Sequence, residues 1–257
     1  MKRLAIILAF ILVPTILAGC TSSEAKKNDN KLVIGVDDKM APLGFRDENN
    51  KLAGFDIDYA KAAAKEMGKE AQFQPIDWST KESELNSDRI DLIWNGYTIT
   101  DERSKKVLFT KPYLENRQVI ATLADSKIQT LQDLNGKVIG LQSLSSAGDA
   151  LDKSPIKDKV KKVSEFADNV TALNDLKNGR LDAVVIDEVV IDYYMAHEKN
   201  TFKVLDHSLA SEKYGIGVKK GNGKLLKSLQ QALDKLNKDG TADKVSEKWF
   251  GEDKILK

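Results

Sequence analysis

Along most of the chain, short apolar runs alternate with segments in which apolar residues recur every three or four positions. The first pattern predicts buried strands, and the second predicts helices with one apolar face. The predicted strands are Leu32–Asp37, Phe73–Ile76, Ile90–Trp94, Lys137–Leu141, Val160–Val163, Ala183–Ile186 and Tyr214–Val218. The predicted helices are Phe55–Met67, a short one opened by a capping box at Ser79 and Glu82, Asp149–Lys153, Val170–Asn178, Glu188–His197, Leu225–Lys238 and one ending at Trp249. This alternation predicts an α/β fold with mostly parallel sheets flanked by helices.

Part of the pattern occurs twice. The segment Leu85–Ile93 resembles Leu176–Val184, with an arginine and an aspartate at the same places in both. These residues are Arg89 and Asp91 in the first copy and Arg180 and Asp182, 91 positions later, in the second. Upstream, Lys31–Val36 resembles Lys137–Leu141. Two matches in the same order predict two lobes of similar topology.

The segment that follows Lys213 has no counterpart in the second copy, so we expect it to return and complete the first lobe. Lobe 1 would then comprise residues 31–120 and 212–257, and lobe 2 would comprise residues 121–211. The chain would cross between the lobes near Val119–Ala124 and again near Asp206–Ser211. Two such crossings predict a hinge.

The N-terminus has the features of an export signal. Lys2 and Arg3 precede the apolar stretch Leu4–Leu17, so we expect residues 1–19 to be a secretory signal peptide. The residues up to Cys20 resemble the bacterial lipobox, which implies a diacylglyceryl anchor on Cys20; an ordinary signal with an unmodified cysteine is the alternative. Residues 20–30 contain almost nothing apolar and predict a lipidated, solvated tether that holds the protein outside the cytoplasm on the cell membrane.

Composition excludes several classes of function. The chain has 40 basic and 39 acidic residues, and without Lys2 and Arg3 the balance is 38 to 39, so no nucleic-acid surface is indicated. Cys20 is the one cysteine, and the two histidines, His197 and His207, have no further ligand at metal-binding spacing. We therefore expect neither an internal disulfide, nor a metal, nor a cofactor.

Polar residues follow four of the predicted strands. In open α/β sheets, ligands bind beyond the carboxyl ends of the strands, so we expect these four segments to line one cleft. They are Asp37 to Met40, Trp94 to Thr98, Gln142 to Ser146, and Asp187.

The chemistry of these segments suits a zwitterion. Arg103, in the helical turn that follows Thr98, can clamp a carboxylate with two parallel hydrogen bonds. Ser145 and Ser146 stand where a helix should begin, and its free N–H groups favour an anion. Asp187 supplies a carboxylate for an ammonium group, and Thr98 can contact either pole.

Each of these residues also has a structural interpretation. Asp187 could cap the following helix, as could Ser145 or Ser146 in their own turn. Arg103 could form an exposed ion pair with an acidic neighbour. Asp37 could be a turn residue, and Met40 and Trp94 could belong to the core. The sequence alone leaves these alternatives open.

Several motifs, in order, resemble the polar amino-acid family (family 3) of bacterial ABC-transporter solute-binding proteins. They are Gly54–Asp58, Gly96–Arg103, Phe109–Tyr113, Gln142–Ser146 and Asp175–Asp187. The resemblance spans roughly residues 31–250. It implies a two-lobed periplasmic-binding-protein-like (Venus flytrap) fold that closes on an L-amino acid, works as a monomer, and passes its ligand to a membrane permease.

The resemblance also implies roles for individual residues. Arg103 would bind the α-carboxylate with help from Ser146, and possible partners of the α-ammonium group would be Asp187, Thr98 and the Gly96 carbonyl. Four residues would lie toward the ligand side chain: Asp37, Met40, Trp94 and Asn95. Leu144 stands where many relatives have glycine, which leaves the division of roles between Ser145 and Ser146 open.

Two other functions are compatible with this fold. A dehydratase or lyase would need a general acid or base in the cleft, and no histidine follows a predicted strand. An amino-acid-sensing domain would need a spanning helix and an output domain, and the sequence predicts neither. We therefore expect a binding protein and not an enzyme.

Overall fold

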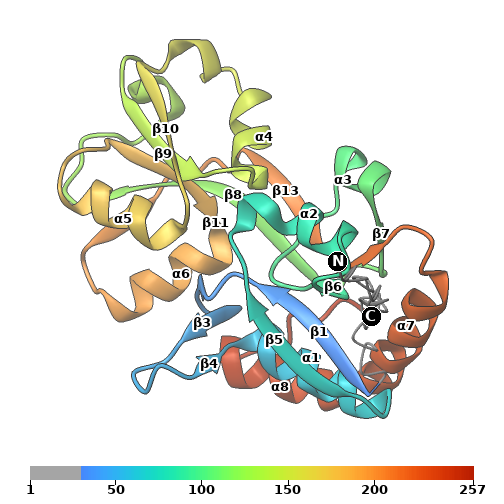
Figure 1. Cartoon of the computed structure of the whole chain (residues 1–257). Helices are drawn as coiled ribbons and strands as arrows, with labels where there is room; N and C mark the ends of the chain where they lie inside the picture. The colour runs from blue at the N-terminus through green and yellow to red at the C-terminus, as the bar shows by residue number, and fades with distance from the viewer. Residues whose placement is uncertain (1–29) are drawn as a thin grey trace, which may run out of the picture.

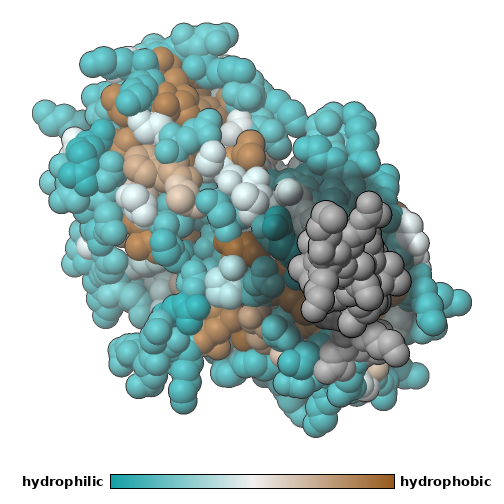
Figure 2. Space-filling view, in the orientation of Figure 1, coloured by the Kyte–Doolittle hydropathy of each residue, from teal (hydrophilic) through white to brown (hydrophobic). Residues whose placement is uncertain are grey.

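The computed structural model describes residues 30–257, so the predicted signal peptide and Cys20 lie outside the described residues. The described chain forms two α/β lobes (Figure 1), as the strand and helix pattern predicted. Hydrophilic side chains predominate on the face seen in Figure 2, with apolar patches on both lobes. Among residues 30–257, no helix combines the length and the apolar character that a bilayer crossing needs.

The first lobe is built on a five-stranded sheet in the order β5-β1-β6-β14-β7. Strand β1 runs parallel to β5 and β6, whereas β14 runs antiparallel to β6 and β7. The strands are β5 (Glu70–Pro75), β1 (Lys31–Val36), β6 (Leu92–Ile93), β14 (Gly217–Lys219) and β7 (Val107–Phe109). A short three-stranded sheet lies beside it, formed by β2 (Lys39–Met40), β3 (Gly44–Arg46) and β4 (Leu52–Ala53).

Three helices of the first lobe, α1 (Phe55–Glu66), α7 (Gly223–Lys238) and α8 (Thr241–Phe250), pack against one another. Helix α7 begins where the Asn222 side chain accepts a hydrogen bond from the Leu225 amide. It buries Leu229, Leu233 and Leu236 on one face. Burial of each side chain contributes about 2 kcal/mol to the free energy of unfolding. The C-terminal segment thus returns to the first lobe, as the sequence predicted.

The second lobe has a sheet in the order β10-β9-β11-β8-β12, in which β9 runs parallel to β10 and β11. The strands are β10 (Lys162–Phe166), β9 (Val138–Gln142), β11 (Ala183–Asp187), β8 (Leu114–Leu123) and β12 (Phe202–Val204). Its helices are α4 (Ser146–Asp152), α5 (Asn169–Lys177) and α6 (Glu188–His197), with 3-10 turns at Leu131–Leu134 and Lys157–Lys159.

Two strands connect the lobes. Strand β13 (Ala210–Tyr214) pairs antiparallel with the first half of β8, from Ala210 opposite Gln118 to Tyr214 opposite Leu114. Tyr214 also forms a bridge with Thr98 of the first lobe. The two connections therefore lie side by side, hydrogen-bonded to each other.

The repeated sequence forms the same contact in both lobes. The Asp91 carboxylate accepts a hydrogen bond from the Val33 amide at 2.8 Å, and Asp182 accepts one from Val138 at the same distance. In each case the aspartate precedes one strand and ties it to the neighbouring parallel strand. The predicted similarity of topology is thus visible at the level of single hydrogen bonds.

The predicted capping box at Ser79 is wrong. Asp77 is the capping residue instead, and its carboxylate accepts from both the amide and the hydroxyl of Ser79. It begins a 3-10 turn, Trp78–Thr80, which leads into α2 (Lys81–Asn86). Aspartate and serine are both favoured capping residues, and here the aspartate accepts the hydrogen bond while the serine donates.

Candidate ligand-binding site

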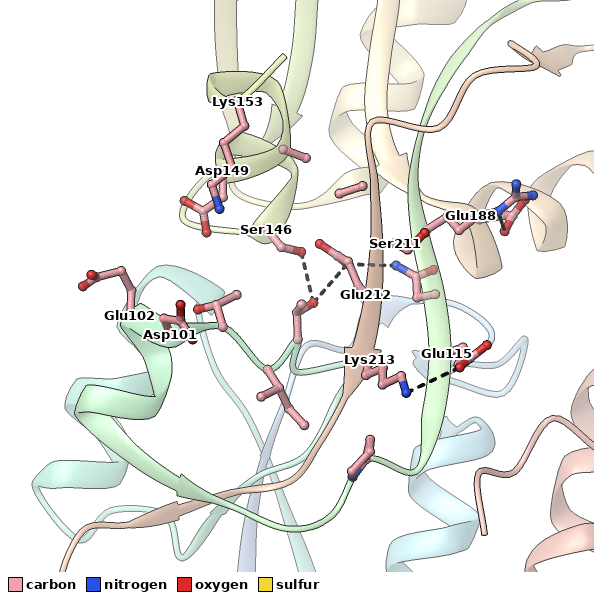
Figure 3. A pocket seen from close by; sticks show the side chains of 18 residues that line it. Asp101, Glu102, Glu115, Ser146, Asp149, Lys153, Glu188, Ser211, Glu212 and Lys213 are labelled. Carbon is pink, nitrogen blue, oxygen red and sulfur yellow. Dashed lines mark hydrogen bonds and ion pairs between the residues drawn. The ribbon is translucent and has the colours of Figure 1, made fainter.

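A groove of about 1180 Å³ lies between the lobes, in front of the two connecting strands (Figure 3). One wall is α3 (Asp101–Lys106) of the first lobe, and the facing wall is α4 of the second. Thr98 and Ser146 lie in the groove, and Glu212 lines it from β13. The ends of predicted strands from both lobes therefore meet here, as the general rule for α/β sheets requires.

Arg103 is buried on the first-lobe side, with 6% of its surface exposed. Its guanidinium donates to the carbonyls of Thr98 (3.0 Å) and Leu144 (3.4 Å) and lies over the Tyr97 ring. Among the described residues, no carboxylate forms an ion pair with Arg103. Its acidic neighbour Glu102 pairs with Lys105 instead. The alternative of an exposed ion pair therefore does not apply.

Asp187 ends β11 and occupies the position that caps α6, yet its side chain makes no capping hydrogen bond. Its Oδ1 instead accepts from the side-chain amides of Asn116 (2.8 Å) and Gln118 (3.0 Å) and from the Tyr214 hydroxyl. Burial, reinforced by the charge of Glu212, raises the pKa of Asp187 to about 7. The Asp187 side chain therefore does not cap α6, and that alternative is wrong.

The two serines have different surroundings. Ser145 caps α4, because its hydroxyl accepts from the Ala147 amide and donates to the Gln142 carbonyl. The Ser146 hydroxyl faces the other lobe, 3.1 Å from the Thr98 hydroxyl, and accepts from Gln118 at 3.2 Å. Ser146 thus faces the groove through its side chain, whereas Ser145 orders the turn before it.

Leu144 adopts the left-handed conformation at φ 52°, a region of backbone conformation that favours glycine. Its side chain is 62% exposed and therefore does not fill the groove. Its carbonyl accepts from Lys81 Nζ at 3.0 Å as well as from Arg103, so two cations of the first lobe hold this turn of the second.

Gly96 lies in a position that no larger residue can occupy. Its φ is 55°, and a Cβ atom there would come within 2.9 Å of the Leu43 and Met40 side chains. Its amide donates to Asp56 at 2.8 Å. Burial raises the pKa of Asp56 to about 7, against the effect of this hydrogen bond and one from Tyr113. Asp56 thus fixes the turn that presents Thr98.

Asp37 both closes a turn and faces the second lobe. One carboxylate oxygen accepts from the Lys39 amide at 2.9 Å, and the other accepts from the Gln142 side chain at 2.7 Å. Burial raises the pKa of Asp37 to about 6. Met40 is buried against Gly96 on the same side of the first lobe.

Of the predicted site residues, Thr98 and Ser146 line the groove. The others are not among its lining residues: Asp37, Met40, Trp94, Asn95, Gly96, Arg103, Ser145 and Asp187. The Trp94 ring is 1% exposed and packs edge-on against Tyr59, with Tyr113 also in contact. Asn95 is fully buried and so close to Gly44 that a Cβ atom there would lie 2.2 Å from the Asn95 oxygen. The structure places the Trp94 and Asn95 side chains in the first-lobe core. For Trp94, this is one of the two positions that the sequence left open.

Sequence reasoning missed three polar residues on the connecting strands: Asn116, Gln118 and Glu212. Each is hydrogen-bonded to Asp187, Thr98 or Ser146. For Asn116 and Gln118, the available signal was a pair of amide side chains two positions apart in β8, since residues two apart in a strand share one face.

Comparison with known proteins assigns the chain to a family. A family model described as bacterial extracellular solute-binding proteins, family 3, matches residues 32–252. The L-cystine-binding protein TcyJ of Escherichia coli (strain K12) is 31% identical over 229 residues, 88% of this chain and 85% of that protein. The ABC transporter arginine-binding protein 1 of the same strain is 36% identical, over 86% of this chain and 90% of that protein.

Solved structures give the same result. A substrate-binding protein of an ABC uptake transporter from Streptococcus pneumoniae, with bound histidine, superposes with a TM-score of 0.86 at 40% identity. The match covers 89% of this chain and 95% of that one. The two-lobed fold and the match to the family model along nearly all of the described residues lead to one conclusion: the chain belongs to the bacterial extracellular solute-binding proteins, family 3.

Proposed function

We propose that this protein binds an L-amino acid outside the cytoplasm and delivers it to an ABC-transporter permease. One observation carries the proposal. A buried guanidinium on one lobe and a buried carboxylate on the other, Arg103 and Asp187, both lack an ion-pair partner among the described residues. A zwitterion between the lobes would supply both missing charges.

The proposed roles follow from this charge pattern. Arg103 and Ser146, with the amides that begin α4 after Ser145, would bind the α-carboxylate. Asp187, Thr98 and the Gly96 carbonyl would bind the α-ammonium group. Toward the ligand side chain, Asp37 and Met40 would form the wall, with Trp94 and Asn95 packed behind them in support.

Binding would close the hinge. We propose residues 31–120 and 212–257 as one lobe and residues 121–211 as the other. Strands β8 and β13, which contain both proposed boundaries, pair with each other and belong to the second-lobe sheet. Because neither lobe holds both charges, a ligand that bridges them favours the closed arrangement in proportion to its extra contacts there. The closed form of a monomer would then be what the permease recognises.

The relatives support the class of ligand. The named ligands are L-cystine, arginine and histidine, which share an α-ammonium and an α-carboxylate group and differ in their side chains. The family consists of solute-binding proteins, and no histidine lines the groove among the described residues, so catalysis of the dehydratase or lyase type has no support.

We also propose that Cys20 anchors the mature protein to the cell membrane through a diacylglyceryl group. The support is the sequence that ends at Cys20 and the polar segment that follows it. Metabolic labelling with a palmitate analogue should mark the wild-type protein, and Cys20→Ser should release an unlabelled form. Labelling that survives Cys20→Ser would contradict the proposal.

A thermal-shift panel tests the ligand class directly. Residues 21–257 would be mixed with each L-amino acid, L-cystine, a set of sugars and short peptides. An amino acid at about 100 times its dissociation constant adds about 2.7 kcal/mol to the free energy of unfolding. A shift with one or a few amino acids supports the proposal, and a shift with a sugar or peptide alone would overturn it.

A further inference from the structure

Two carboxylates lie next to each other at the junction of the lobes, one from Asp187 and one from Glu212. They share two hydrogen-bond donors. The Asn116 amide nitrogen lies 2.8 Å from Asp187 Oδ1 and 3.1 Å from Glu212 Oε2. The corresponding distances from the Gln118 amide nitrogen are 3.0 Å and 3.1 Å.

All the groups that donate to this pair are neutral. Beyond the two shared amides, the Tyr214 hydroxyl donates to Asp187 and the Thr98 hydroxyl donates to Glu212. Among the described residues, neither carboxylate has a cation in ion-pair contact. Asp187 is buried and Glu212 is half-buried, so the two like charges repel each other and the pair favours a cation brought from outside.

Two other carboxylates that line the groove have cationic partners. Glu115 pairs with Lys213 at 3.7 Å, and Glu188 pairs with Arg117. Both are exposed ion pairs at the edge of the groove, whereas Glu212 projects from β13 into the groove (Figure 3). Glu212 thus differs from Glu115 and Glu188 because it has no cationic partner among the described residues and shares its donors with Asp187.

Further acceptors belong to the side chains that contact the two carboxylates. The Gln118 carbonyl oxygen is buried and has no hydrogen-bond partner in the structure. It belongs to the side chain whose nitrogen donates to both carboxylates, and the Thr98 oxygen is bonded to Glu212. Carboxylate, amide and hydroxyl oxygens thus belong to one network, and these are acceptors that a primary ammonium group, with three N–H donors, can use. The described residues contain no group of three or more side chains suited to hold a metal ion.

We propose that Glu212 is a second carboxylate for the α-ammonium group of the ligand, acting together with Asp187, and that it makes the site selective for a protonated primary amine. The inference rests on the proposed function, because it needs an amino acid in the groove. Glu212 belongs to the connecting strand β13, so the ammonium group would contact the element about which the lobes move.

The test compares ligands that differ in the α-ammonium group alone. L-arginine and L-histidine would be titrated against their α-hydroxy analogues, argininic acid and imidazolelactic acid, by calorimetry at pH 7.5. The variants are Glu212→Gln, which keeps the shape and removes the charge, and Glu115→Gln as a control from the same groove. The analogues lack the ammonium group, so they report every other effect of the substitution.

For whichever amino acid binds, Glu212→Gln should weaken affinity at least about tenfold, and the preference over its α-hydroxy analogue should shrink by the same factor. Glu115→Gln should change neither quantity. Equal losses for amino acid and analogue, or a loss under twofold, would overturn the role of Glu212. If Glu212→Gln does not fold, Glu212→Asp replaces it, and unchanged selectivity there would also count against the proposal.

The two proposals fail in different ways. If neither amino acid, nor any other in the thermal-shift panel, binds the wild-type protein, the proposed function itself fails. If an amino acid binds and Asp187→Asn abolishes binding while Glu212→Gln leaves selectivity intact, the proposed function stands and the inference on Glu212 is wrong.

Discussion

The hydroxyl oxygens of Thr98 and Ser146 lie 3.1 Å apart, although Thr98 belongs to the first lobe and Ser146 begins a helix of the second. The Asp37 and Gln142 side chains make a second contact of this kind, at 2.7 Å. Residues with which we expect the ligand to interact thus also bind each other across the groove. A bound amino acid would replace some of these contacts with stronger, charge-assisted ones.

Arg103→Ala should weaken amino-acid binding by about 2–5 kcal/mol, because the ligand carboxylate would be left in a dry site without its cation. Arg103→Lys should restore only part of the loss, since an ammonium group cannot form two parallel hydrogen bonds. Calorimetric titration measures both effects. Arg89→Ala is the matched control, because Arg89 is an exposed arginine that pairs with Glu84. Affinity within twofold of wild type in Arg103→Ala would rule out the carboxylate role.

Asp187→Asn should stabilise the protein without ligand and weaken the binding of the amino acid. The pKa of Asp187 is raised to about 7 in the folded protein. Between about pH 4 and pH 7 the unfolded chain therefore loses this proton while the folded protein keeps it, and the free energy of unfolding falls as the pH rises. The variant should therefore have a higher melting temperature than wild type at pH 7.5 and the same one near pH 4. A lower melting temperature at pH 7.5 would contradict this assignment of the pKa.

The affinity of the wild-type protein should rise between pH 5.5 and pH 7.5. An ammonium group requires the ionised form of Asp187, and burial keeps part of this carboxyl protonated below its raised pKa. Titration of the amino acid found in the thermal-shift panel across this range measures the effect. In Asp187→Asn the remaining affinity should depend less on pH, and an unchanged pH profile would assign the effect to another group.

Leu144→Gly should raise the free energy of unfolding by about 0.5–1 kcal/mol. The left-handed conformation of Leu144 is strained for a residue with a Cβ atom, and its exposed side chain contributes little packing. Chemical denaturation with urea measures the change. Leu144→Val should be destabilising because β-branched residues tolerate this conformation least. Loss of stability in Leu144→Gly would show that the leucine side chain has a packing role.

Lys39→Met should weaken ligand binding slightly, by at most about 1 kcal/mol, and the loss should shrink at high salt. Lys39 pairs with Asp168 of the second lobe at 2.7 Å, and the lysine is half exposed. Titrations at 50 and 500 mM salt measure the effect. Lys61→Met is a suitable control, since Lys61 pairs with Asp58 within one helix. An effect that is independent of salt would point to packing and not to the ion pair.

Much of this site could be predicted because strand ends are visible in the sequence. The strands β1, β9 and β11 end within one residue of their predicted ends. Asp37 therefore follows a first-lobe strand, and Ser146 and Asp187 lie at the ends of second-lobe strands, as predicted. The helix that starts at Ser146 was equally predictable from its serine cap. The repeat of Asp91 at Asp182 correctly indicated two lobes of similar topology.

Other parts depend on contacts between distant segments. Asn116 and Glu212 meet only because β8 pairs with β13, and nothing local to either strand encodes that pairing. Trp94 was ambiguous because β6 contains only two residues, so the alternation of inward and outward side chains cannot be extrapolated beyond its end. Where the next residue points is decided by packing against Tyr59.

Strand β14 lies between β6 and β7 in the first sheet, yet it is one of the last elements of the chain. The second lobe is nearly continuous in sequence, whereas the first has a gap in the middle of its sheet until residues 217–219 are available. As the chain emerges from a translocation channel, we expect the second lobe to form first, with the first lobe incomplete beside it. The first lobe therefore begins to be synthesised first but is completed last. The groove would form only after both lobes are complete.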